Sequence, residues 1–165
     1  MGLRRLVLGD RQTIAGTVYG TIVVLAALMG GVKAFPNDLW GLAAVAAVTT
    51  LVLWVAHVYS HGLGESLNLG RRLTAGELRE IAQREFSIPL AGVLPLAAVV
   101  LGAVGVLEAG TAVWAAFLVG LATLGAQGLR YARVEQLSTT GTVLTVAINL
   151  ALGLTIVVMK AILVH

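Results

Sequence analysis

The sequence predicts an all-α, polytopic membrane protein: a bundle of five transmembrane helices, with a cytoplasmic amphipathic helix between the second and the third. Hydrophobic residues make up 58% of the 165 residues and charged residues only 12%, and the mean hydropathy is +0.94. Soluble domains are far less apolar. Five apolar runs are close to the roughly 20 residues that a hydrocarbon layer of about 30 Å requires. A chain of this length predicts a single membrane domain, residues 1–165.

The predicted spans are joined by short connections. They cover residues 13–32, 39–60, 88–107, 111–129 and 141–164. Before the second span, Pro36 ends extended structure and either Asn37 or Asp38 can cap the helix. Pro95 lies inside the third span, where it removes a backbone hydrogen bond and predicts a kink that serves either packing or a cavity. The short turn around Glu108 makes the third and fourth spans antiparallel neighbours.

The basic residues predict the orientation. Of the 11 Lys and Arg residues, all but Lys33 and Lys160 precede the first span, separate the second from the third, or follow the fourth. Because cytoplasmic loops carry an excess of Lys and Arg, the N-terminus is predicted to be cytoplasmic and the C-terminus extracytoplasmic, in a plasma (inner) membrane. The net charge of +3 is therefore a topology signal and does not indicate nucleic-acid binding. The absence of cysteine excludes disulfides and thiolate metal sites.

An amphipathic helix is predicted for residues 74–86, in the cytoplasmic connection after the second span. Thr74 and Glu77 have the spacing of a capping box, and the following residues separate into an apolar and a charged side. The helix can lie on the membrane surface or dock on the bundle. Alternatively, its carboxylates Glu77, Glu80 and Glu85 can collect a metal ion or gate a pathway.

Two histidines and a glutamate occur at intervals of four residues where the second span ends. Four helical residues turn about 400°, so His57, His61 and Glu65 fall on one helix face. Neutral imidazoles at this spacing can bind one transition-metal ion, with a carboxylate completing or orienting the site. Imidazole also titrates near neutral pH, which suits a proton relay. The remaining alternative is that these are interfacial residues without a ligand.

Polar side chains within the spans gather in the predicted cytoplasmic half. Each needs a protein or water partner there, because lipid offers no hydrogen bonds. We expect six of them to line a pocket or pathway that opens to the cytoplasm: Thr17, Tyr19, Gln127, Thr142, Thr145 and Asn149. Small residues at four-residue spacing, such as Gly16 and Gly20, predict close helix contacts within the chain or in a homo-oligomer.

The segment SHGLGESL, Ser60 to Leu67, resembles the second-helix motif of the vacuolar iron transporter family, typically SMALGEYLS. The five-span layout and the Glu-bearing insertion are also similar to that family. The resemblance implies that His61 stands where the family has a metal-contacting Met, and Glu65 at its Gly-Glu step. It also implies that Glu77, Glu80 and Glu85 form a reduced metal-binding insertion. The first span lacks the acidic residue that the family carries beside a glycine, and the insertion is shorter.

Two functions are compatible with this sequence. The first is a membrane transporter or channel for a cation, either a divalent transition metal or a proton, with the bilayer and copies of the same chain as partners. The second is a non-transporting membrane sensor, scaffold or accessory subunit. An enzyme is not predicted, because the histidine spacing matches neither HExxH nor a catalytic triad, and no residue is assigned a catalytic role. A transition-metal ion is the only cofactor candidate.

Overall fold

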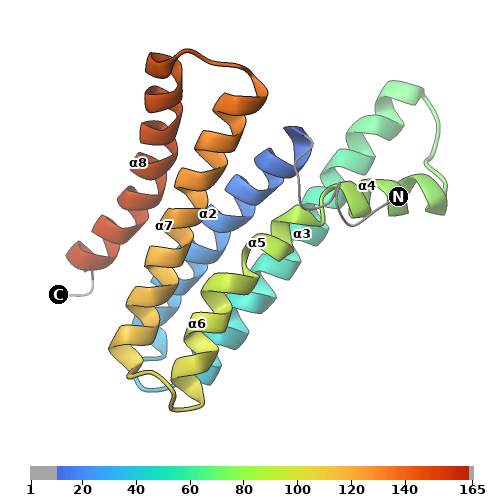
Figure 1. Ribbon diagram of the computed structural model, residues 1–165. Helices are drawn as coiled ribbons and strands as arrows, with labels where there is room; N and C mark the ends of the chain where they lie inside the picture. Colours follow the sequence, from blue (N-terminus) through green and yellow to red (C-terminus); the bar gives the residue numbers. More distant parts are fainter. Residues whose placement is uncertain (1–10, 164–165) are drawn as a thin grey trace.

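The computed structural model describes residues 11–163, apart from the side chains of Arg11, Lys160, Ala161 and Leu163. Arg4, Arg5 and the Lys160 side chain, which support the predicted orientation, thus lie outside the described part. Over the described residues the chain is all-α and contains no strand, as predicted (Figure 1). The helices are α2 (Arg11–Ala34), α3 (Leu39–Leu69), α4 (Ala75–Arg84), α5 (Ser87–Ala91), α6 (Val93–Ala103), α7 (Ala109–Val134) and α8 (Thr139–Leu163).

Four helices are long and apolar enough to cross a membrane. They are Gln12–Ala34, Leu39–Leu69, Ala109–Val134 and Thr139–Met159. A fifth crossing arises only if Ala75–Ala91 and Val93–Ala103, which meet at an angle of 42°, are counted as one span. In Figure 1, α5 and α6 run beside α3 toward the end of the bundle that holds the α2–α3 connection. The chain is therefore a helical protein with several membrane-compatible helices, and the fifth span stays a prediction.

The third predicted span is broken and not simply kinked. The break falls at Gly92, between α5 and α6, three residues before Pro95. Pro95 has no N–H to donate to the carbonyl of Ala91, and its ring would clash with that carbonyl in a continuous helix. The chain therefore closes a tighter turn, in which the Gly92 N–H donates to the carbonyl of Pro89 at 3.1 Å.

Helix α3 is longer than the predicted span of residues 39–60. It continues to Leu69 and ends at Gly70, whose φ of 63° is the left-handed conformation that favours glycine at a helix C-terminus. Helix α4 packs on one side of α3 at the buried Gly62, where an added methyl group would lie 3.2 Å from Leu78 Cδ1. At about 1.5 Å per residue, α3 is about 46 Å long and exceeds a hydrocarbon layer of about 30 Å.

Helix α2 is the central element, and it packs against α3, α5, α7 and α8. The predicted glycine pair allows the closest of these approaches: a methyl group added at Gly16 would overlap Ser87 Oγ, and one at Gly20 would overlap the Ile88 carbonyl. Farther along α2, a core of apolar side chains fills the half of the bundle near the α2–α3 connection. Its buried members include Val24, Leu25, Leu28, Leu42, Ala46, Val99 and Phe117.

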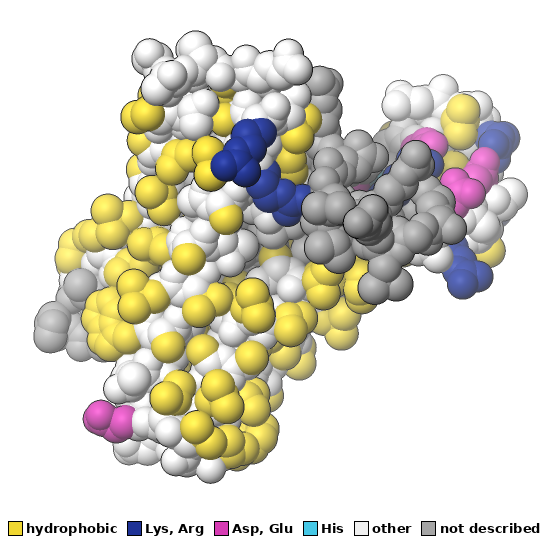
Figure 2. Space-filling model, viewed as in Figure 1, with side chains coloured by type: hydrophobic (Ala, Val, Ile, Leu, Met, Phe, Trp, Pro, Cys, Tyr) yellow, Lys and Arg dark blue, Asp and Glu magenta, His cyan; other side chains and the backbone are white. Residues whose placement is uncertain are grey.

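The surface separates apolar from basic regions. Hydrophobic side chains cover much of the bundle in Figure 2, while the visible Lys and Arg side chains gather toward the end that carries α4. All six described arginine side chains follow α3, lie on or near α4, or lie in the last turns of α7: Arg71, Arg72, Arg79, Arg84, Arg130 and Arg133. This arrangement is compatible with an integral membrane location. That this end faces the cytoplasm stays a prediction.

Candidate cation site

Three segments bring two imidazoles and one carboxylate together. His57 and His61 lie one turn apart on α3, with ring centroids 4.7 Å apart. Glu85 occupies the two-residue turn between α4 and α5 and is only 4% exposed. Its Oε2 lies 3.4 Å from His57 Nε2, and its Oε1 lies 3.4 Å from His61 Nδ1. A buried carboxylate is costly without partners. The two histidine contacts, together with a hydrogen bond from Gln12 of α2, explain why Glu85 is tolerated here.

Helix α2 supplies the next layer around this cluster. Gln12 Nε2 donates a hydrogen bond of 3.0 Å to Glu85 Oε1. One face of the Tyr19 ring stacks on His57, with ring centroids 5.4 Å apart. Gln12 therefore fixes the carboxylate, and Tyr19 limits the rotation of one imidazole, so the cluster depends on α2 as well as on α3.

The cluster lies near one end of the membrane-compatible part of α3. His57 comes about 27 Å along the helix from Leu39, at about 1.5 Å per residue, within a hydrocarbon layer of about 30 Å. Deeper along α3, the Trp54 ring contacts Phe86 edge-on at 6.0 Å between centroids. His57 and His61 are partly exposed, with 31% and 51% of their side-chain surfaces accessible. An ion can therefore reach the imidazoles from the end that carries α4.

The three ligand groups are close enough to share one ion. One ligand atom from each of His57, His61 and Glu85 lies within 4.8 Å of the other two. Tetrahedral zinc, with bonds of about 2.0–2.2 Å, needs ligand atoms about 3.4 Å apart. Small side-chain rotations would thus close the cluster around an ion. Two imidazoles and one carboxylate suit divalent transition metals better than Mg²⁺ or Ca²⁺, which prefer oxygen ligands.

The other carboxylates proposed from the sequence lie outside this cluster. Glu65 is exposed on α3, one turn beyond His61. Glu77 completes the predicted capping box with Thr74 and binds Arg71, whose Nη2 lies 2.6 Å from Glu77 Oε1. The hydrogen bond from the Arg71 guanidinium, together with those from Thr74, lowers the pKa of Glu77 to about 2. Glu80 forms an ion pair with Arg84 on α4, with Arg84 Nη2 3.6 Å from Glu80 Oε2. Of the four glutamates, the structure brings only Glu85 to the imidazoles.

The six residues predicted to line a pathway divide into two groups. Thr17 donates to the carbonyl of Thr13 and Thr142 to that of Ser138, each four residues earlier in the chain. The buried Gln127 accepts a bond of 3.3 Å from Arg130 Nη1. Tyr19, Thr145 and Asn149 instead line an open groove of about 460 Å³ between α2, α7 and α8. The rest of the groove is mostly apolar: Ile14, Ala15, Val18, Ile22 and Tyr131. A pathway through all six residues stays a prediction.

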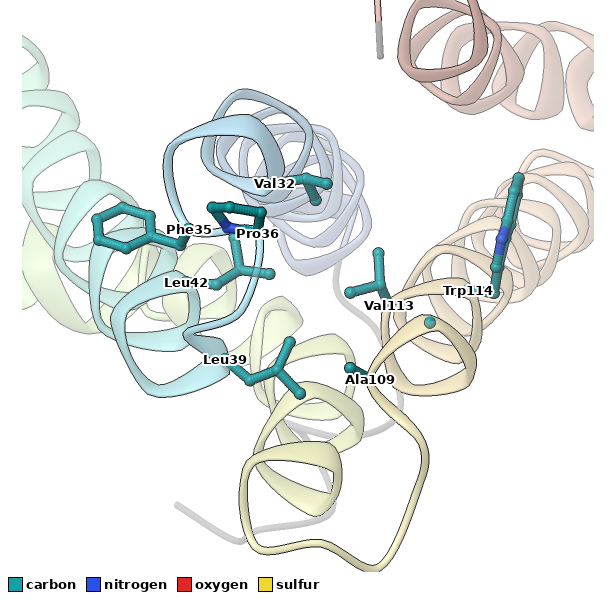
Figure 3. Close-up of a pocket in the computed structure, with 9 residues that line it drawn as sticks. Val32, Phe35, Pro36, Leu39, Leu42, Ala109, Val113 and Trp114 are labelled. Atoms are coloured by element: carbon teal, nitrogen blue, oxygen red, sulfur yellow. The ribbon is translucent and has the colours of Figure 1, made fainter. Parts of the chain in front are cut away.

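The opposite end of the bundle has a different character. A pocket of about 150 Å³ lies where the α2–α3 connection meets the start of α7, and Figure 3 shows the side chains that line it. They are almost entirely apolar: Val32, Phe35, Pro36, Leu39, Leu42, Ala109, Gly110, Val113 and Trp114. Together with the apolar core, this lining offers no ligand for a cation within the described pocket.

The sequence interpretation did not include Gln12 among the site residues. Gln12 lies one turn before Gly16 and two turns before Tyr19, on the side of α2 that meets α5 and His57. A polar amide one helical turn from a close-packing glycine could have indicated a buried hydrogen bond. Its partner could not be read from the sequence, because Glu85 is 73 residues away in the chain.

No protein-family model, no curated protein and no solved structure matches this chain. The resemblance to vacuolar iron transporters consequently rests on the short Ser60–Leu67 motif and the layout alone.

Proposed function

We propose that this protein is an integral membrane transporter or channel for a cation, and that its substrate is a divalent transition-metal ion. The observation that carries this proposal is the convergence of His57, His61 and Glu85, whose ligand atoms lie within 4.8 Å of one another. In this proposal, the cluster is the entry site at the cytoplasmic end of the bundle. Of the two substrates that the sequence allows, imidazole ligation favours the metal ion over the proton.

Each residue has a defined part in ion capture. The two imidazoles supply neutral nitrogen ligands, and Glu85 supplies the negative charge that a divalent ion needs in a poorly solvated site. Gln12 orients the carboxylate through the bond to Oε1. Outer-shell bonds of this kind fix the ligand geometry and commonly affect metal affinity by about 10- to 100-fold.

Movement of the ion beyond this site requires a rearrangement of the bundle. The core around Leu28, Leu42 and Phe117 is closed and apolar. The break at Gly92 connects α5, which follows Glu85 directly, to α6, which packs against that core. Broken helices in transporters often form binding sites and moving elements. We therefore assign the hinge of the transport cycle to the α5–α6 junction.

A homo-oligomer forms part of the same proposal. Helix α8 packs against α7 and α2, and most of its remaining surface is exposed. Ala147 and Ala151 lie on this exposed surface and would allow close approach of a second copy.

One observation favours a second candidate, a non-transporting metal sensor or accessory subunit. The pocket at the far end is apolar, and a core without ligands separates it from the cation site. A protein that only binds a cation and reports its presence needs no path through that core. The two candidates share the cation site and differ in whether the ion crosses.

The test has two stages. In the first, Zn²⁺ or Mn²⁺ binding to purified protein is measured by calorimetry, and we expect the double variant His57→Ala, His61→Ala to lose it. In the second, the same ions are offered to liposomes that contain the protein. Binding together with flux of Zn²⁺ or Mn²⁺ supports the transporter. Binding without flux of either ion supports the sensor. Unchanged binding in the double variant contradicts both.

A further inference from the structure

The groove between α2, α7 and α8 contains an amide without a protein partner. Among the residues that the structure describes, the side-chain amide of Asn149 makes no hydrogen bond, although it packs on α7. A methyl group added at Gly128 would lie 2.8 Å from Asn149 Nδ2, so this glycine makes room for the amide. Asn149 comes about 15 Å along α8 from Thr139, about halfway across a hydrocarbon layer of about 30 Å. An amide at this depth needs a hydrogen-bonding partner, because lipid chains provide none.

The groove has the dimensions and lining of a small-molecule site. Its volume of about 460 Å³ is within the usual range of about 300–1,000 Å³. The walls are aliphatic, with two tyrosines and the polar groups of Thr145 and Asn149 placed among them. Tyr19 and Tyr131 are also partly exposed, at 39% and 41%, so the groove is open to a molecule that arrives from the side.

We infer that the groove binds a membrane-soluble quinone-type molecule: a flat ring with carbonyl acceptors and an apolar tail. The Asn149 amide would donate to a ring carbonyl, and the tyrosines and aliphatic side chains would contact the ring and tail. A phospholipid acyl chain fits the apolar walls equally well, but it leaves the amide unpaired, since its ester carbonyls lie at the membrane interface. The proposal concerns binding only, and no electron transfer is assigned.

This site is distinct from the cation cluster but adjoins it. Tyr19 lines the groove and also stacks on His57 at 5.4 Å between ring centroids. Tyr19 therefore contacts both sites. The binding of a quinone does not depend on a metal ion, so the two proposals can succeed or fail separately.

The test uses decylubiquinone and protein in phosphatidylcholine nanodiscs, with protein-free nanodiscs subtracted and no metal added. We expect saturable binding that Asn149→Leu weakens about tenfold, the equivalent of about one hydrogen bond. Thr155→Val is the matched control, because Thr155 lies exposed on the same helix and donates to the carbonyl of Ala151 at 2.8 Å. This variant should bind as the unmodified protein does. If Asn149→Leu unfolds, Thr145→Val takes its place, with the same direction of effect.

Three results would overturn the proposal. The first is equal binding by the unmodified protein and the groove variants. The second is a co-purified phospholipid that decylubiquinone does not displace. The third is an Asn149→Leu protein that loses a dimer and nothing else, since the amide would then pair with a second copy. Glu85→Gln, which should weaken metal binding and leaves the stacking of Tyr19 on His57 in place, should retain quinone binding. This result separates the quinone proposal from the cation site.

Discussion

Gln12 donates a hydrogen bond of 3.0 Å to Glu85 Oε1, although 73 residues separate the two in the chain. This bond joins the start of α2 to the turn between α4 and α5, and it holds the glutamate that, in the described part of the chain, reaches both imidazoles. The first prediction follows from this position.

Replacing Gln12 by Ala should weaken transition-metal binding about 10- to 100-fold without unfolding the protein, because the carboxylate loses the partner that orients it. Calorimetry with Zn²⁺ measures the effect. Gln83→Ala, a change of the same type at an exposed position of α4, is the control and should leave the affinity unchanged. Gln12→Glu offers an additional readout, since a further carboxylate should restore or increase affinity for a divalent ion.

The second prediction distinguishes Glu85 from its neighbours in the sequence. Glu85→Gln removes the negative charge but keeps the size of the side chain, so metal binding should fall at least about tenfold while the fold persists. Glu80→Gln and Glu65→Gln alter exposed carboxylates outside the cluster and should have little effect. If all three variants weakened binding equally, the ion would be held by the diffuse charge of this region and not by a defined site.

The sequence predicted the local parts of this architecture correctly. The all-helical fold, the membrane-compatible helices and the Thr74–Glu77 capping box follow from hydropathy and from spacing along one helix. The proximity of His57 and His61 has the same origin, since residues four apart on a helix are neighbours.

The remaining features depend on tertiary packing. Glu77, Glu80 and Glu85 were equivalent candidates, and the choice among them required the path of the chain from α4 into α5. The membrane span was predicted to end at Ser60, while the face shared by His57, His61 and Glu65 implied that the helix continues to Glu65. The end of α3 at Gly70 was not predicted, and α4 packs against α3. Pro95 was predicted to kink the third span, and the bend of 42° falls at Gly92 because proline disturbs the carbonyl four residues before it, that of Ala91.

The third prediction concerns the approach of α5 to α2. A methyl group at Gly20 would overlap the Ile88 carbonyl, which is backbone and cannot rotate away. Gly20→Ala should therefore lower the free energy of unfolding by about 1–3 kcal/mol, the usual range for overpacking. Gly30→Ala is the control on the same helix: nothing lies within 4 Å of its added methyl group, so the change should be neutral or stabilising by up to about 1 kcal/mol. Denaturation of both variants in the same detergent decides the point, and equal stabilities would mean that α5 is not packed on Gly20.

The last prediction concerns the acid sensitivity of the α4 N-terminus, outside the membrane-spanning helices. The hydrogen bond from Arg71, followed by those from Thr74, lowers the pKa of Glu77 from 4.5 to about 2. Because the folded pKa is the lower one, the ionised carboxylate stabilises this turn above pH 4.5, and the contribution disappears as the pH falls toward 2. Arg71→Ala removes the largest cause, so the pKa of Glu77 should rise toward 4.5, while the remaining Thr74 bonds keep it below that value.

Carboxyl-selective NMR in detergent micelles would follow the Glu77 titration directly, with amide exchange of the first α4 turn as a structural readout. In the unmodified protein, this turn should stay protected at pH 4 and open only in stronger acid. The Arg71→Ala protein should lose protection at a higher pH. Arg72→Ala, which removes an exposed neighbouring guanidinium, should leave the titration in place. A Glu77 titration midpoint near pH 4.5 in the unmodified protein would show that the Arg71–Glu77 pair does not persist in solution. Helix α4 would then be held only by the buried Ile81 and by the packing of α4 against α3.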